Sequence, residues 1–216
     1  MTDKDDKPAL LQAIELVLTD PAEIRKESLS LQKEFYNKYS NSKATDEINA
    51  LIVDKIISKY SYYAAFSGGT TALSGIIPGL GTAVTLFGGA VVDTAACMKF
   101  QIEMTMAIAT IYGHNIEVEE EKRMCFIVAG LGAVNEAAKE GGKKLGSKAF
   151  IKMAQQYLKG SYLVAVKEIF KKVGVTFTRK ALEKAIPFGI GVIVGLSANK
   201  ALTIYVGNKA KDFFDV

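Results

Sequence analysis

Apolar positions recur with the 3.6-residue period of helices along most of the chain, and no segment shows the two-residue alternation of a strand. The first predicted helix is Pro8–Leu18. The second begins after Asp20, with Asp as the N-cap and Pro21 at the first helical position, and runs to about Tyr39. A third helix is expected to begin at Thr45, where acidic residues follow in the first turn.

The later elements are also predicted to be helical. After a break at Pro78-Gly79, a long helix is expected from Thr82 to Tyr112, with Gly113 as its terminator. The remaining predicted helices cover residues 118–139, 143–158, 161–172, 176–185 and Pro187–Phe214. This pattern predicts an all-α fold, a multi-helix bundle with a central glycine-rich helical hairpin.

The longest uncharged stretch of the chain is the 33-residue run from Tyr60 to Val92, which Pro78-Gly79 divides into two arms. Its glycines lower helix stability by about 1 kcal/mol each relative to alanine, which favours a role in close helix packing. The last helix has glycines four residues apart in the segment GVIVG. The hairpin and this helix are therefore expected to pack through Gly75, Pro78, Gly79, Gly81, Gly191 and Gly195.

The two arms are short for membrane spans. Tyr60–Ile77 would be about 27 Å long as a helix, against about 30 Å for the hydrocarbon core. The second arm, Thr82–Val92, is followed directly by Asp93. A charged carboxylate near a bilayer centre would cost about 3 kcal/mol. Three readings follow: a two-pass transmembrane hairpin, a hairpin buried in a soluble bundle, or a hairpin that lies shallowly in one leaflet.

Asp93 is the polar residue that stands out, because it lies in an otherwise apolar helix. A buried polar cluster with Asn199 and Lys200 of the last helix would fix the register of the two helices. The alternative is a recognition site that uses Asp93 and Glu103 in an enzyme or a small-molecule binder. Glu103 itself is expected on an exposed or rim face.

Composition adds a charge asymmetry. Residues 1–120 carry a net charge of −6 and residues 121–216 a net charge of +10. Lysines beside apolar segments attract anionic lipid headgroups, although a solvated helix face gives the same pattern. The candidate membrane-surface lysines are Lys143, Lys144, Lys148, Lys152, Lys171 and Lys172. They are spread over several helices without interleaved aromatics, so nucleic acid is not an expected partner.

The sequence offers no catalytic constellation, metal site or cofactor motif. There is no nucleophile elbow and no phosphate loop. His114 and Glu117 lie at a helix connection, where a surface role is expected rather than metal binding or acid–base chemistry. Cys97 and Cys125 are expected to be buried thiols in a reducing compartment. No secretory signal precedes the first helix, so a cytoplasmic location is expected.

Three segments together resemble the EcsC protein family. They are SGIIPGLGTAVTLFGGAVVD, the Ile111-Tyr112-Gly113 turn and KAIPFGIGVIVGLSANKALTIYVGNKAKDFF. The resemblance covers about residues 45–214, so residues 1–44 are expected to be an N-terminal helical extension and 45–216 the EcsC-like domain. The residues that match the family pattern are Pro78, Gly79, Asp93, Tyr112, Gly113, Pro187, Gly191 and Asn199.

The resemblance implies an all-α bacterial protein, from a family named after a companion of an ABC transporter and without an established enzymatic activity. The glycine- and threonine-rich stretch before Asp93 departs from the leucine and alanine expected there, which argues against permanent insertion. The expected function is a non-enzymatic, membrane-associated protein that contacts anionic lipids or a membrane protein, peripheral at the inner face of the cell membrane. The alternative is a soluble helical regulatory module whose hairpin is core.

Overall fold

The computed structural model describes residues 9–66, 77–139 and 196–215, and within them all regular structure is helical. The helices are α1 (Ala9–Val17), α2 (Pro21–Tyr39), α3 (Thr45–Phe66), α5 (Leu80–Phe87), α6 (Gly89–Ile111), α7 (Glu119–Lys139) and α11 (Leu196–Phe214). The all-α prediction is confirmed for this part of the chain.

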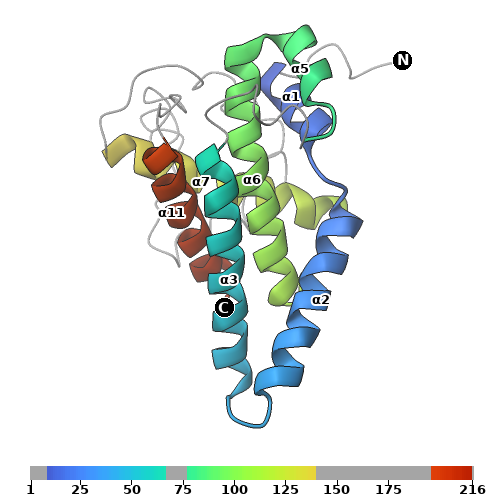
Figure 1. Ribbon diagram of the computed structural model, residues 1–216, viewed down its shortest axis with the longest axis vertical. Coiled ribbons are helices and arrows are strands. Elements are labelled where there is room, and N and C mark those ends of the chain that lie inside the picture. The colour runs from blue at the N-terminus through green and yellow to red at the C-terminus, as the bar shows by residue number, and fades with distance from the viewer. Residues whose placement is uncertain (1–8, 67–76, 140–195, 216) are drawn as a thin grey trace.

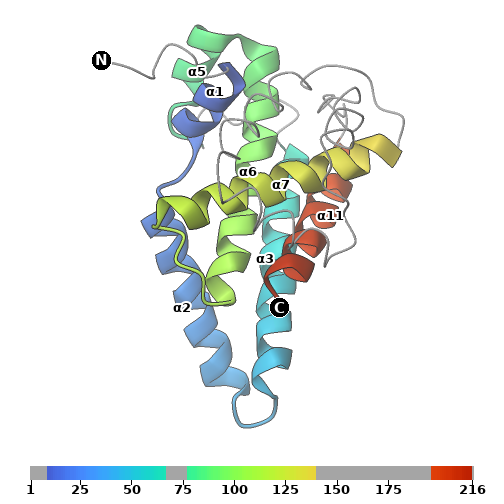
Figure 2. The same cartoon turned by 180° about the vertical axis from the view of Figure 1, so that it is seen from behind.

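The helices are arranged around α6 (Figures 1 and 2). α2 and α3 form an antiparallel pair joined by a tight turn at one end, and both pack on α6. α1 and α5 lie together at the opposite end, where each also contacts α6. On the other side α7 crosses α6, and α11 packs against α3, α6 and α7.

Local signals place the first helices where the sequence predicts them. Asp20 Oδ1 accepts a hydrogen bond from the Ala22 amide at 2.8 Å, which caps the first turn of α2. Pro21 occupies a first-turn position, where its missing N–H removes no helical bond. In α3, Asp46 and Glu47 lie in the first turn, where the helix dipole favours negative charge. The predicted bounds of the second helix and the predicted start of the third are therefore confirmed within two residues.

The central helix α6 is buried all round over its second half, and every residue from Met98 to Ile111 is buried. A helix that is apolar on all faces belongs inside a bundle. Its hydroxyls bond back to its own backbone: Thr105 Oγ1 donates to the Gln101 carbonyl at 2.8 Å, and Thr110 Oγ1 to the Met106 carbonyl at 2.9 Å. These bonds let threonine sit in the core without unsatisfied hydroxyls.

The prediction of a single helix from Thr82 to Tyr112 is wrong. The structure has two helices there, α5 and α6, which meet at Gly88. Gly88 has φ 81° and ψ 156°, a conformation that side chains with a Cβ rarely adopt, so the helix ends there and begins again at Gly89. The break turns α5 across the end of the bundle, so that α5 packs on α1 and α6.

Two glycines allow close contacts between helices. At Gly79, where φ is 80°, a Cβ would lie 2.8 Å from the carbonyl oxygen of Leu16, so the start of α5 sits directly on α1. At Gly207 of α11, a Cβ would lie 2.7 Å from Ile57 Cγ1 and 3.0 Å from Met104 Sδ. Gly207 was not singled out from the sequence, because it lies outside the GVIVG segment.

Two of the other residues predicted to pack helices together, Gly81 and Pro78, lie in the described part of the chain. No heavy atom lies within 4 Å of the Cβ position at Gly81, and Pro78 is exposed. Gly75, Gly191 and Gly195 lie outside the described residues. Among the helices that the structure describes, none is long and apolar enough to cross a membrane.

Candidate functional site: a cavity beside a buried ion pair

The most unusual polar feature is an ion pair inside the bundle. Lys99 and Glu103 lie four residues apart on one face of α6, and their Nζ and Oε1 atoms are in direct contact. Both residues are only 4% exposed. Burying two charges is favourable only when both are matched by hydrogen-bonding partners, so the surrounding groups decide whether the pair is tolerated.

The link between α1 and α2 supplies those partners. The Thr19 amide donates to Glu103 Oε1 at 2.8 Å, and Lys99 Nζ donates to Thr19 Oγ1 at 2.9 Å. One residue thus bonds to both members of the pair, across eighty or more positions of sequence. The bonds fix the N-terminal helices to α6 at this point.

A cavity of about 640 Å³ opens beside the pair. Its walls come from the α1–α2 link, the first turns of α2, the end of α3, residues 77 and 78, and α6. The aromatic residues in the wall are Tyr60, Tyr62, Tyr63, Phe66 and Phe100. The volume and the mostly apolar wall with a few charged groups are typical of small-molecule sites.

A second hollow of about 650 Å³ lies beside the cavity, between α2 and α3. Glu27 and Lys59 line both hollows and face each other across the groove, with Lys59 Nζ 3.2 Å from Glu27 Oε2. The Lys59 ammonium also lies 5.6 Å from the ring centre of Tyr60 and 5.8 Å from that of Tyr63. This ion pair therefore forms a bridge between the two hollows.

The carboxylates give the cavity wall a negative character. Burial raises the pKa of the Tyr60 phenol far above its ordinary value, and the charges of Glu103 and Glu27 raise that pKa further. The Tyr60 phenol therefore keeps its proton at physiological pH.

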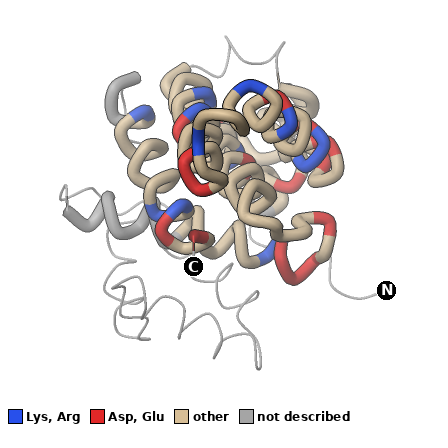
Figure 3. The backbone as a smooth tube through the Cα atoms, turned by 90° about the horizontal axis from the view of Figure 1, so that it is seen from below, with Lys and Arg blue, Asp and Glu red and all other residues tan. Residues whose placement is uncertain are grey.

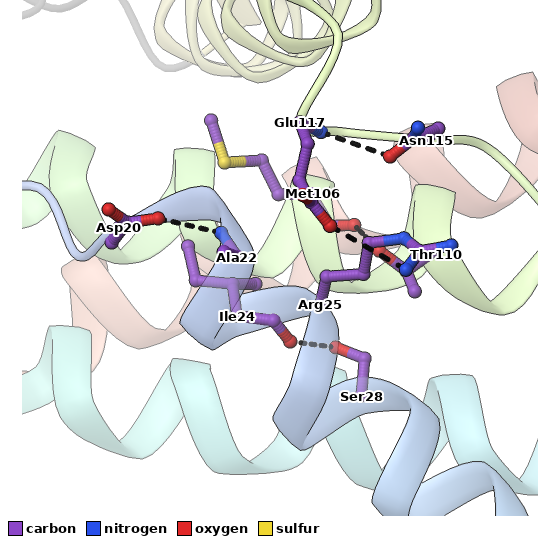
Figure 4. A network of polar contacts seen from close by, with 9 residues as sticks. All are labelled: Asp20, Ala22, Ile24, Arg25, Ser28, Met106, Thr110, Asn115 and Glu117. Carbon is purple, nitrogen blue, oxygen red and sulfur yellow. Dashed lines mark hydrogen bonds and ion pairs between the residues drawn. The ribbon is translucent and has the colours of Figure 1, made fainter.

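A second polar contact fixes the α2 wall of the cavity (Figure 4). Arg25 reaches from α2 toward the α6–α7 connection, where its Nη1 lies 3.6 Å from Glu117 Oε1. The Glu117 amide in turn donates to Asn115 Oδ1 at 3.3 Å. Arg25 Nε is buried and has no acceptor among the described residues. The contact joins α2 to the connection between α6 and α7.

The polar cluster predicted from the sequence is not the one at the centre of this site. Asp93 is half-buried in the first half of α6, and Asn199 is buried in α11. The Lys200 ammonium lies 3.8 Å from the ring centre of Tyr62 on α3, a cation–π contact. Lys200 therefore joins α11 to the α3 end that lines the cavity.

The expectation that Glu103 lies on an exposed or rim face is wrong. Its carboxylate is buried because Lys99, one turn earlier, and the Thr19 amide neutralise and bond it. The signal that was available is a Lys and a Glu four residues apart in an otherwise apolar helix. Such a spacing on a helix without a polar face indicates an internal pair.

His114 and Glu117 are held by different partners. His114 Nδ1 lies 2.8 Å from Glu121 Oε2, and its ring packs edge-on against Phe214. Glu117 pairs with Arg25 instead. Among the described residues no group of three or more His, Cys, Asp or Glu side chains is placed to hold a metal ion.

The expectation of buried thiols is confirmed for Cys125 and wrong for Cys97, which is half-buried. The two cysteines do not form a disulfide. Burial raises the pKa of the Cys125 thiol well above its ordinary value. Figure 3 shows basic and acidic residues interspersed over the described helices. The six lysines proposed for a membrane surface, Lys143 to Lys172, lie outside these residues.

Fold and site define an all-α bundle with an internal ion pair and a cavity lined by aromatic side chains. The chain belongs to the EcsC protein family, because the model of that family matches residues 9–216. The match begins in α1, and both α1 and α2 pack on α6, whereas the division at residue 44 stays a prediction. Comparison with curated proteins and with solved structures found no match.

Proposed function

We propose that this chain is a non-enzymatic, membrane-associated helical protein that contacts anionic lipid or a membrane protein, as an accessory to an ABC transporter. The observation that supports this most directly is the exposed apolar surface of α5. Leu86 is 64% exposed and Val84 39%, whereas the same helix buries only Leu80 and Ala83 against the bundle.

The position of α5 suits a shallow contact with a membrane. It lies at one end of the molecule, carries no charge, and sits within the uncharged run that ends at Asp93. A short helix with one buried and one exposed apolar face can lie in the headgroup region without spanning the bilayer. The net charge of +10 in residues 121–216 would add attraction to anionic headgroups.

Flotation with vesicles tests this proposal. Phosphatidylcholine vesicles with and without phosphatidylglycerol would be compared, using the wild-type chain, Leu86→Glu and the control Leu51→Glu. Leu51 is also an exposed leucine, but it lies near the α2–α3 turn, at the other end of the bundle.

We expect anionic vesicles to bind the wild-type chain and the control. Leu86→Glu should lower binding about five- to tenfold, because it replaces an exposed apolar side chain of the lipid contact with a carboxylate. Binding that is the same for Leu86→Glu and Leu51→Glu would remove α5 from the proposal. No binding to either vesicle, with full recovery in the soluble fraction after a carbonate wash, would overturn it.

The second candidate is a soluble helical module that regulates a protein partner. It is favoured by the close contact at Gly207, where α11 packs into the core against α3 and α6. A detergent-free, monodisperse chain with one cooperative melt and no vesicle binding would support this reading over the first.

A further inference from the structure

The cavity beside Lys99 and Glu103 has no role in the membrane contact proposed above, and it is built from different residues. Its wall carries three carboxylates, those of Glu23, Glu27 and Glu103, against the two ammonium groups of Lys59 and Lys99. Lys99 is matched by Glu103 and Lys59 by Glu27. Glu23 is therefore the charged residue of the cavity wall that belongs to neither ion pair.

The aromatic residues of the wall already hold ammonium groups of the protein itself. Lys59 Nζ lies over the rings of Tyr60 and Tyr63, and Lys200 Nζ lies 3.8 Å from the ring centre of Tyr62. The face of an aromatic ring attracts a cation through its quadrupole, most strongly where water is excluded. These lysines show which kind of group the rings accept.

We propose that this cavity binds an organic ammonium cation. The cation would lie among Tyr62, Tyr63 and Phe66, with Glu23 supplying the opposite charge. Among the residues that line the cavity, the carboxylates outnumber the ammonium groups by one, and both of these ammonium groups are paired, so the lining itself favours a cation over an anion. The cavity volume of about 640 Å³ holds such a cation together with a short apolar substituent.

The same ammonium chemistry is found in free amines and in the headgroups of lipids. The Glu27–Lys59 bridge separates the cavity from the hollow between α2 and α3, and a ligand with a longer chain would have to displace it. The side chain of Lys59 is 42% exposed, so it can swing out toward water while its stem stays on the ring of Tyr60.

Calorimetric titration of the full chain with choline tests the proposal, and the neutral isostere 3,3-dimethyl-1-butanol serves as the matched ligand control. We expect choline to bind at least about fivefold more tightly, because only the charged ligand gains from the rings and from Glu23. Equal binding of the two would show an ordinary apolar pocket and overturn the proposal, as would binding of acetate in place of choline.

Two variants locate the binding. Glu23→Gln is expected to weaken choline binding about three- to tenfold, whereas Glu34→Gln, an exposed glutamate farther along α2 that lines only the second hollow, should leave it unchanged. Tyr63→Leu should weaken it by a similar factor, with folding checked by its thermal melt. Equal affinity in Glu23→Gln and Glu34→Gln would place the ligand elsewhere and overturn the assignment.

Competition by phosphatidylcholine vesicles then identifies the source of the cation. If such vesicles displace choline from the wild-type chain, the site accepts a lipid headgroup. If they do not, it accepts free ammonium compounds. Both results agree with a cation site in this cavity. Vesicle flotation that depends on Leu86 and choline binding that depends on Glu23 are separate measurements, so either proposal can fail alone.

Discussion

Lys99 and Glu103 depend on each other because they form a buried ion pair in successive turns of α6. Lys99→Met would leave the Glu103 carboxylate with the Thr19 amide as its remaining described partner. We expect the free energy of unfolding, measured with urea, to fall by about 3–5 kcal/mol. Lys99→Met combined with Glu103→Met should recover most of that loss, since no charge then stays buried. If the double variant is no more stable than the single one, the pair does not act as a unit.

Among the glycines that the structure describes, Gly207 is the one where an added Cβ would come closest to an atom of another helix. A methyl group there would overlap Ile57 and Met104, so Gly207→Ala should lower the free energy of unfolding by about 1–3 kcal/mol. Gly81→Ala, on the exposed side of α5, is the control and should not lower it. Thermal melts of both variants measure the difference. An unchanged melt for Gly207→Ala would show that α11 can shift outward without loss.

Tyr60 makes stability depend on alkaline pH. Because its pKa is raised above the ordinary value of 10.0, the folded chain keeps the phenolic proton that the unfolded chain releases. The contribution is therefore complete below pH 10 and falls as pH rises beyond it. We expect the free energy of unfolding to drop more steeply above pH 10 in the wild-type chain than in Tyr60→Phe. Parallel curves would mean that Tyr60 does not titrate with unfolding.

At the scale of the elements, the meeting point of α5 and α6 is set by Gly88. Gly88→Ala forces a Cβ into a positive φ and should lower stability by about 1–2 kcal/mol. Gly81→Ala lies in a helix with open space around it and should raise stability by up to about 1 kcal/mol. Urea unfolding of both variants compares the same substitution in two backbone conformations. Equal effects would show that Gly88 is not required for the break.

The elements also show what local sequence signals can and cannot establish. The start of α2 was predictable because Asp20 caps a turn only two residues away. The break at Gly88 was missed because Gly88 and Gly89 lie in an apolar stretch whose period continues through them. The cavity was beyond prediction for another reason: its walls join Thr19, Tyr63 and Glu103, which periodicity cannot bring together.

At the scale of the whole molecule, the N-terminal helices are part of the core. α1 and α2 cover α6, and Thr19 bonds both members of its ion pair. We expect a chain that begins at residue 45 to bind a hydrophobic dye and to lose its cooperative melt. Residues 1–44 supplied as a separate chain, cut at the exposed turn after Tyr39, should restore the melt. A fragment that melts like the full chain would establish 1–44 as an appendage.

The central place of α6 also bears on how the chain is made. Synthesis proceeds from the N-terminus, so α1, α2 and α3 leave the ribosome before α6, the helix on which all three pack. Until α6 has emerged, the apolar faces of these helices have, among the described helices, only one another and α5 to contact. α11, which covers α3 from the other end of the sequence, arrives last of all. A nascent chain stalled before α6 should therefore be held by chaperones, and one stalled after α7 should be released.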